Sequence, residues 1–252
     1  MPRALIFGGT GKVARRLTTL LRSKNPPWEV YSIIRDPSQN ESLSETGANP
    51  ILQSIEESSV EELQGTIAQT KPDVVVWSAG AGGKGGPQRT DAVDRQGAIK
   101  VFDALRPGDR FIMVSAVDVR DRENKPQPEW YDGGDVQRSE MMWGSIGHYM
   151  RAKYAADRDL RVNNEKRGLK YTIVRPGFLN DEPGKGMVAA GKVHIEKMIS
   201  RDDVAATILA CIQNEGTIGL AFDVVGGETS IEEAVRSVAE KKEDCFEGYY
   251  QA

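Results

Sequence analysis

Cysteine pairs, clustered basic residues and long apolar runs are missing from this sequence, and each absence excludes a class of protein. The 252 residues include two cysteines, Cys211 and Cys245, which lie far apart and form no C-x-x-C pair. Neither a disulfide framework nor a zinc site is therefore expected. No run approaches the roughly 18 apolar residues of a membrane span, and the apolar stretch directly after Met1-Pro2-Arg3 leaves no room for a signal peptide. We expect a cytoplasmic protein with no membrane partner and no metal.

The charged residues are numerous, but the two signs are mixed along the chain. Lys and Arg total 33 and Asp and Glu total 37, which gives a formal net charge of -4. A nucleic-acid-binding surface needs a clustered basic face, and no stretch of this sequence gathers one. We therefore expect a small-molecule substrate rather than a nucleic acid, bound by a monomer or a homodimer.

Short β-branched or aromatic runs alternate with helical patterns along the whole chain. Seven of these runs are predicted to be strands, at residues 4–7, 29–34, 50–53, 74–77, 111–114, 171–175 and 221–225. Strands that alternate with helices predict a parallel sheet covered on both faces. The prediction is a single α/β domain over residues 1–252, with a doubly wound, Rossmann-type sheet.

Two stretches interrupt the alternation, and both follow predicted strands. Residues 118–147 mix charges, glycine and proline with Trp130, Tyr131 and Trp143, whereas residues 178–199 are rich in glycine. Ligands of open α/β sheets bind beyond the carboxyl ends of the strands. We predict that both stretches are substrate-facing walls, although the aromatic residues could equally cover the core.

The first predicted strand runs directly into a glycine-rich turn and an amphipathic helix. Glycine permits the tight turn and lets backbone N–H groups approach a pyrophosphate, which the helix N-terminus then stabilises. This position between strand and helix predicts a dinucleotide site, and a plain tight turn is the alternative. The residues predicted to bind are Gly8, Gly9, Thr10, Gly11, Lys12 and Val13.

The end of the second predicted strand bears on the choice of cofactor. An acidic residue there would bind ribose hydroxyls, whereas an arginine would attract a 2′-phosphate. Arg35 comes first here, before Asp36, and Lys12 adds a second positive charge nearby. NADP(H) is therefore predicted. The alternative is that Arg35 is a solvated strand-end residue and that Asp36 caps the next turn.

A second glycine-rich stretch, residues 78–86, follows the fourth predicted strand. It does not match a P-loop, because Gly85 stands where a Ser or Thr hydroxyl would bind magnesium. We interpret the stretch as a loop that contacts the phosphates and ribose of the cofactor. For residues 82–86, a flexible glycine linker is an equally good interpretation.

Tyr149 and Lys153 are four residues apart, so both project from one face of a helix. An unperturbed tyrosine has a pKa of about 10, and a nearby positive charge favours its phenolate form. A pKa three units lower would require about 4 kcal/mol, which the lysine and a nicotinamide ring could supply in a water-poor cleft. The pair is predicted to transfer protons, and a surface contact is the alternative.

Several motifs follow one another in a defined order and are more specific together than any one alone. Together they resemble an atypical short-chain dehydrogenase/reductase of the NAD(P)H-binding, epimerase-like group. The resemblance covers almost the whole chain. The motifs are Gly8-x-x-Gly11-x-x-Ala14, Ile34-Arg35-Asp36-Pro37, Ala92-Val93-Asp94-x-x-Gly97-Ala98, Tyr149-x-x-x-Lys153 with Ala156-Asp157, Thr172-Ile173-Val174-Arg175-Pro176-Gly177-x-Leu179, Ser200-Arg201-x-Asp203-Val204-Ala205 and residues 222–228.

This resemblance implies a strand order of 3-2-1-4-5-6-7, with the nucleotide lying across the carboxyl ends of the strands. It also assigns further cofactor contacts. These are Ser54 and Ile55 at the adenine, Ala79, Gly80 and Ala81 at the phosphates and ribose, Lys153 at the nicotinamide ribose, and Pro176, Gly177 and Leu179 beside the nicotinamide.

The resemblance also points to a catalytic set of Tyr149, Lys153, Ser115 and Asp94, with two departures from the family pattern. Relatives usually place a Ser or Thr one or two residues beyond the position of Ser115, where this chain has Ala116 and Val117. Asp94 stands in place of the tetrad asparagine of the broader superfamily. The first difference would alter how a substrate carbonyl is polarised by a hydroxyl. The second would alter a proton relay through Lys153.

The expected function is NADPH-dependent reduction of a small, apolar or aromatic, carbonyl or quinone-like compound. Tyr149 would donate the proton and Lys153 would bind the nicotinamide ribose. An NADP(H)-binding sensor or regulatory protein with little catalysis is one alternative, favoured by Asp94, Ala116 and Val117. An epimerase or dehydratase is another, although such enzymes generally need a larger C-terminal substrate domain than the residues after 178 could build.

Overall fold

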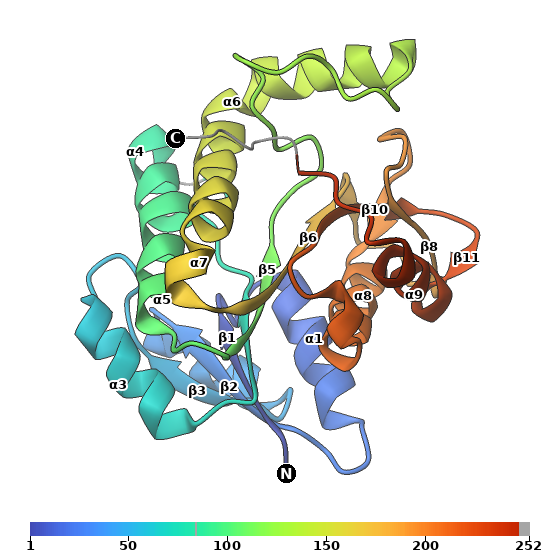
Figure 1. Ribbon diagram of the computed structural model, residues 1–252. Helices are drawn as coiled ribbons and strands as arrows, with labels where there is room; N and C mark the ends of the chain where they lie inside the picture. The colour runs from blue at the N-terminus through green and yellow to red at the C-terminus, as the bar shows by residue number, and fades with distance from the viewer. Residues whose placement is uncertain (84, 247–252) are drawn as a thin grey trace.

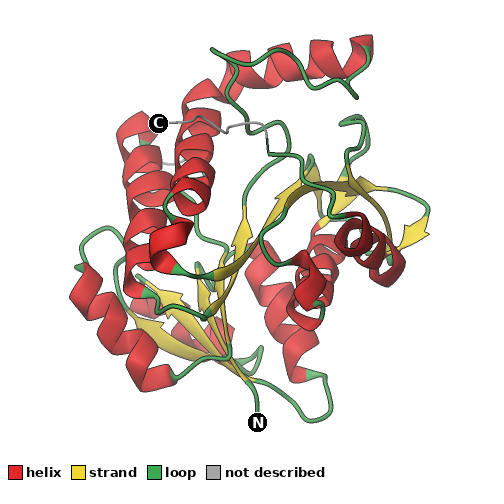
Figure 2. Cartoon of the chain, in the orientation of Figure 1, coloured by secondary structure: helices red, strands yellow, loops and turns green. Residues whose placement is uncertain are grey.

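The computed structural model describes residues 1–83 and 85–246, in which strands and helices alternate. The predicted doubly wound α/β architecture is confirmed, because one large sheet carries helices on both faces (Figure 2). All seven predicted strands are present, each within one residue of its expected bounds. They are β1 (Arg3–Phe7), β2 (Glu29–Ile34), β3 (Asn49–Leu52), β4 (Val74–Trp77), β5 (Arg110–Val114), β6 (Lys170–Pro176) and β10 (Ala221–Gly226).

These seven strands pair in parallel and lie in the order 3-2-1-4-5-6-7, with β10 as the seventh, so the order that the resemblance implied is also confirmed. Four short strands were not predicted. β8 (Met187–Gly191) pairs antiparallel with β10, and β11 (Thr229–Ser230) extends that edge. β7 (Leu179–Asn180) and β9 (Ile199–Ser200) form a separate parallel pair.

The helices form two layers, one on each face of the sheet (Figure 1). One layer consists of α1 (Lys12–Arg22), α8 (Arg201–Gln213) and α9 (Ile231–Lys241). The other consists mainly of α3 (Val60–Thr70), α5 (Ala98–Ala104) and α6 (Gly133–Val162). The shorter elements are η1 (Pro37–Gln39), α2 (Asn40–Ser44), α4 (Gly86–Thr90), the π-helical turn η2 (Asp91–Gly97), α7 (Asn164–Arg167) and η3 (Glu215–Thr217).

Strand alternation divides the interior into two apolar cores. In β1, Ala4 and Ile6 belong to the core under α1 and α8, whereas Leu5 and Phe7 belong to the core under α5 and α6. All four side chains are fully buried, as expected of a central strand whose successive residues point to opposite faces. β1 therefore packs against both helix layers and ends at the carboxyl edge of the sheet, directly before Gly8.

α6 changes direction at Ile146, whose φ of -129° and ψ of 29° are not helical. Gly144 and Gly147 flank this residue, and sharp helix kinks occur at such glycine-containing segments. The first half of the helix extends across the top of the molecule, and the second half runs down beside the sheet (Figure 1). Half of the predicted wall at residues 118–147 is thus helical. In the described part of the chain, no helix combines the length and apolarity needed to cross a membrane.

Candidate functional site

A groove lies at the carboxyl ends of β1, β2 and β4. Its described lining comes from the glycine-rich turn after β1, the end of β2, the loop after β3, and the loop after β4 with the helical turns that follow it. Gly8, Thr10 and Gly11 line the groove from the turn after β1, and Arg35 lines it from the position directly after β2. The groove therefore occupies the crevice where open α/β sheets bind their ligands.

The glycine-rich turn leaves no room for side chains on its inner side. Gly8 has a φ of +79°, and a Cβ added to it would lie 2.6 Å from the Cα of Ala79. A Cβ on Gly9 would lie 2.4 Å from the Cβ of Ser32. Gly11 then donates its N–H to the carbonyl of Gly8 at 2.9 Å and precedes α1. The free N–H groups at the start of a helix suit a pyrophosphate, so the turn fits a dinucleotide.

Of the sixteen predicted cofactor residues, eight belong to the described lining of this groove. They are Gly8, Thr10, Gly11, Arg35, Ile55, Ala79, Gly80 and Ala81. Ser54 instead faces a separate surface depression, where its hydroxyl accepts the N–H of Glu57. Val13 is buried in the core under α1, and Lys12 is held by an ion pair.

Lys12 Nζ lies 2.5 Å from Asp181 Oδ2, and its side chain is mostly exposed. Arg16 and Arg201 pair with the same carboxylate. Asp181 follows β7, so these pairs connect the start of α1 to the second predicted wall. The positive charge expected from Lys12 beside a 2′-phosphate is thus partly neutralised by Asp181.

Arg35 directly follows β2 and lines the groove, with its side chain about half exposed. It donates to Glu56 Oε1 at 3.1 Å. Asp36 accepts the N–H and the hydroxyl of Ser38 and so caps η1. Asp36 therefore caps the turn after β2, as the alternative interpretation of this segment states, whereas Arg35 lines the groove.

Tyr149, Lys153 and Asp94 come together where α6 packs on η2. Lys153 Nζ lies 3.3 Å from Asp94 Oδ1 and 5.7 Å from the centre of the Tyr149 ring. Both charged side chains are almost completely buried. Asp94 Oδ2 also accepts the N–H of Ala81 at 2.9 Å, so Asp94 joins the pair on α6 to the wall of the groove. Asp94 lies in a π-helical turn, a feature frequent at functional sites.

The pKa of Tyr149 is raised above its usual value, which corrects the expected lowering. Burial is the main cause, and the negative charges of Asp94 and Asp157 act in the same direction. Lys153 does act to lower this pKa, but burial outweighs it. Burial lowers the pKa of Lys153, but Tyr149, Asp94 and Asp157 raise it more strongly, so the net shift is upward. The phenol and the ammonium group therefore both keep their protons at neutral pH.

Ser115 is buried, and its hydroxyl donates to Asp157 Oδ2 at 2.7 Å. Burial raises the pKa of Asp157 to about 6, although the hydrogen bond from Ser115 and the charge of Arg175 oppose the shift. The hydroxyl proton of Ser115 thus points at a carboxylate. Asp157 belongs to the motif around Lys153, which assigned it no catalytic role, although its position four residues after Lys153 places it on the same helix face as Tyr149.

The residues expected beside the nicotinamide lie beyond the described lining of the groove. Pro176 is buried at the end of β6, and Leu179 begins β7. Gly177 donates its N–H to the carbonyl of Val224 at 2.9 Å, and a Cβ there would lie 2.9 Å from the Val225 side chain. These residues turn the chain tightly from β6 to the second predicted wall.

Tyr149 belongs to a third, small apolar cluster that is separate from the two main cores. Val117, Val119, Met142, Met150 and Ile195 form its buried part. Tyr131 and Trp143 pack against it, as Tyr149 does. Trp130 packs instead on the core under α1. The first predicted wall thus covers apolar interior and contributes to the apolar cluster against which Tyr149 packs.

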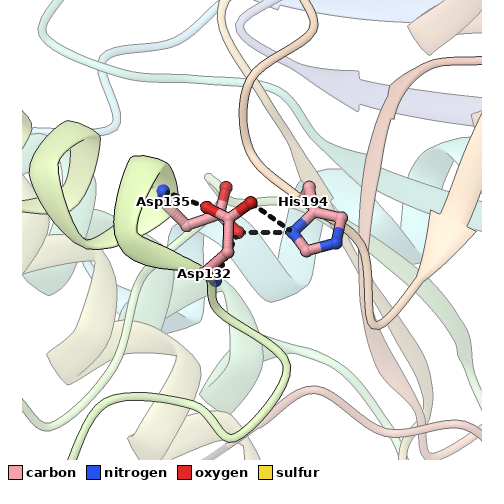
Figure 3. A group of neighbouring side chains, drawn as sticks. All are labelled: Asp132, Asp135 and His194. Atoms are coloured by element: carbon pink, nitrogen blue, oxygen red, sulfur yellow. Dashed lines mark hydrogen bonds and ion pairs between the residues drawn. The ribbon is translucent and has the colours of Figure 1, made fainter.

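Asp132, Asp135 and His194 connect the two predicted walls (Figure 3). Asp132 and Asp135 begin α6, where each carboxylate accepts the backbone N–H of the other residue. His194 Nδ1 lies 2.5 Å from Asp135 Oδ2, and the N–H of Ile195 donates to Asp135 Oδ1. The three side chains lie close enough to hold a metal ion. Because these hydrogen bonds already engage the carboxylates and Nδ1, we interpret the group as a link between the walls.

This link should make stability depend on pH. The hydrogen bond to Asp135 raises the pKa of His194 above 6.5, so its contribution is complete below that value and is lost as pH rises through the raised pKa. We expect His194→Gln to lower the melting temperature more at about pH 6 than at about pH 9, measured by circular dichroism. His148→Gln is the matched control, and an equal effect of both variants at every pH would contradict the link.

Known proteins resemble this chain along most of its length. A family model described as NAD(P)H-binding matches residues 8–215. The UPF0659 protein C216.03 of Schizosaccharomyces pombe is 39% identical over 244 residues, which are 96% of this chain and 97% of that protein. The uncharacterized sugar epimerase YhfK of Bacillus subtilis is 35% identical, covering 94% of this chain and 100% of that one. The structure of a putative NAD-dependent epimerase/dehydratase from Bacillus halodurans superposes with a TM-score of 0.75 at 32% identity, covering 94% of this chain and 100% of that one.

Proposed function

Because this chain belongs to the NAD(P)H-binding family and is an atypical short-chain dehydrogenase/reductase, we propose that it is an NADPH-dependent reductase. The proposed substrate is a small, apolar or aromatic, carbonyl or quinone-like compound. The family supports an NAD(P)-dependent oxidoreductase or epimerase-like enzyme. The finer proposal depends chiefly on the phenol of Tyr149, which keeps its proton beside a buried, charged lysine that is tied to the cofactor groove.

The protonation of Tyr149 supports reduction rather than oxidation. Reduction of a carbonyl needs a proton for the oxygen, and a phenol with a raised pKa carries that proton at neutral pH. Bound NADPH supplies the hydride. Once the proton has left Tyr149, the ammonium group of Lys153 stabilises the phenolate across a desolvated contact. The substrate thus gains one hydride and one proton and becomes an alcohol.

Two further observations support the cofactor and the substrate class. Arg35 offers a guanidinium at the rim of the groove, which favours a cofactor with a 2′-phosphate. The small apolar cluster around Tyr149 favours a substrate with a flat or apolar body. Ser115 is engaged by Asp157, so we assign polarisation of the substrate oxygen to Tyr149 rather than to Ser115.

The test is hydride transfer by the purified protein. NADPH absorbance is followed while aldehydes, ketones and quinones are added one at a time, and the reaction is repeated with NADH. Consumption of NADPH with formation of the matching alcohol or quinol is expected for at least one class. Binding of NADPH without turnover of any compound would instead identify a sensor.

Replacing Asp94 with asparagine should shift the pH profile of this reaction. Asp94 raises the pKa of Tyr149, so its removal leaves the lowering effect of Lys153 less opposed. The alkaline limb of kcat/KM, where the phenol loses its proton, should then move to lower pH. Asparagine can still accept the N–H of Ala81. An unchanged alkaline limb in a variant that folds and binds NADPH would exclude this role for Asp94.

A sugar epimerase is the second candidate, favoured by the name of the Bacillus subtilis relative. Such an enzyme returns the hydride to its substrate and shows no net use of cofactor. Conversion of a sugar to its epimer, with no net consumption of cofactor and no solvent deuterium entering the carbon skeleton, would favour it over the reductase.

A further inference from the structure

Three charged side chains from different elements meet at one end of the cofactor groove. Arg35 follows β2, Glu56 follows β3, and Arg89 lies in α4 after β4, and all three line the groove. Glu56 Oε1 accepts Arg35 at 3.1 Å and Arg89 at 3.3 Å. One carboxylate oxygen is therefore shared by two guanidinium groups from different elements.

The loop that carries Glu56 is held rigidly. Lys100 on α5 donates to the carbonyls of Ile55, Glu56 and Ser58 at 2.6, 3.1 and 2.8 Å. Gly97, one turn earlier, lets the side chain of Ile55 pack closely, because a Cβ there would lie 2.6 Å from Ile55 Cγ2. Glu56 thus extends from a fixed backbone, and its side chain is the part that can move.

Arg89 is also positioned by more than Glu56. Its Nη1 donates to the carbonyl of Ala81 at 3.4 Å, on the same loop whose N–H is held by Asp94. Its side chain is only 20% exposed, compared with 54% for Arg35. Arg89 is thus the more fixed of the two arginines, and Arg35 is the more mobile.

We propose that Arg35 and Arg89 form a two-arginine anion subsite for the 2′-phosphate of the cofactor, and that Glu56 occupies this subsite as a replaceable internal anion. A phosphate presents more acceptor oxygens and more negative charge than a carboxylate, and two guanidinium groups can bind it through several charge-assisted hydrogen bonds. Glu56 keeps the arginines in place without a ligand and competes with the phosphate. This inference rests on the proposed preference for NADPH and adds two residues that determine it.

Binding of adenosine 2′,5′-bisphosphate and of 5′-AMP tests the subsite without any turnover. Titration calorimetry on the full chain should give tighter binding of the bisphosphate to the wild type. Arg89→Ala should weaken the bisphosphate by about tenfold or more, since hydrogen bonds to charged groups are being lost, and change 5′-AMP by less than about twofold. Glu56→Gln should tighten the bisphosphate relative to 5′-AMP, because a competing anion is removed.

Arg95→Ala is the matched control, because Arg95 pairs with Asp91 on η2 and does not belong to the described lining of the groove. Circular dichroism verifies that each variant folds. Equal weakening of both nucleotides by Arg89→Ala, or weaker bisphosphate binding in Glu56→Gln, would overturn the subsite while leaving the NADPH preference intact. A wild type that binds both nucleotides equally would remove the preference itself, and the subsite with it.

Discussion

Tyr149→Phe should lower kcat for reduction by about 10²- to 10⁴-fold, the usual contribution of a positioned proton donor. The change removes one oxygen, and the ring can keep its place in the small apolar cluster with Met150 and Ile195. Because the phenol does not line the described part of the groove, the affinity for NADPH should stay within about twofold, well below the 1.4 kcal/mol of a tenfold change. Steady-state kinetics and calorimetry measure the two quantities separately.

Tyr154→Phe is the control, because Tyr154 lies on the same helix but its hydroxyl interacts with Asp121 instead of the buried lysine. Its kcat should remain close to that of the wild type. Full activity in Tyr149→Phe would show that another group supplies the proton, and the buried carboxyl of Asp157, with a pKa of about 6, would be the next candidate.

The pattern of strands and helices was readable from the sequence because each strand in the sheet centre is a short apolar run bounded by polar turns. β1, β4 and β6 are buried along nearly their whole length, which is typical of parallel sheets covered on both faces. β8 and β11 lack that signal. They lie at the sheet edge, where β8 is only partly buried and β11 spans two residues, and pairing there depends on how the second wall folds back against β10.

The conformation of the glycine-rich turn was predictable, because local geometry determines it. Gly8 has a positive φ, as a tight strand-to-helix turn requires, whereas its close contact with Ala79 depends on the folded sheet. The partners of Ser115, Lys12 and Arg35 were not predictable. Asp157, Asp181 and Glu56 lie 42, 169 and 21 residues away in sequence, and only the folded chain brings each carboxylate to its partner.

The same limit explains the wrong direction for the pKa of Tyr149. The sequence places Lys153 one turn away, which predicts a lowering. It does not reveal that Asp94 would meet Lys153 at 3.3 Å in a site shielded from water. Desolvation and two carboxylates then outweigh the lysine. A charge pattern on one helix therefore gives the sign of one contribution to a pKa. The net pKa shift depends also on the elements that pack against the helix.

Gly8→Ala should reduce the affinity for NADPH by roughly two orders of magnitude or more, since losing two hydrogen bonds to a charged group costs about 3–6 kcal/mol. The new Cβ would lie 2.6 Å from the backbone of Ala79, at a φ of +79° that alanine adopts only with strain. Relief requires the turn or the loop after β4 to move, and both form the groove. Calorimetry with NADPH measures the loss, and thermal melting separates it from unfolding.

Two further glycine variants make this expectation specific. Gly65→Ala on α3 is the control, because nothing lies within 4 Å of its added Cβ, and alanine there should leave NADPH binding unchanged. Gly9→Ala meets mainly the side chain of Ser32, at 2.4 Å from its Cβ. A second change, Ser32→Gly, should therefore restore part of the binding that Gly9→Ala loses. No such rescue exists for Gly8, whose obstacle is backbone, so NADPH binding by Gly8→Ala at wild-type affinity would mean that the cofactor does not use this turn.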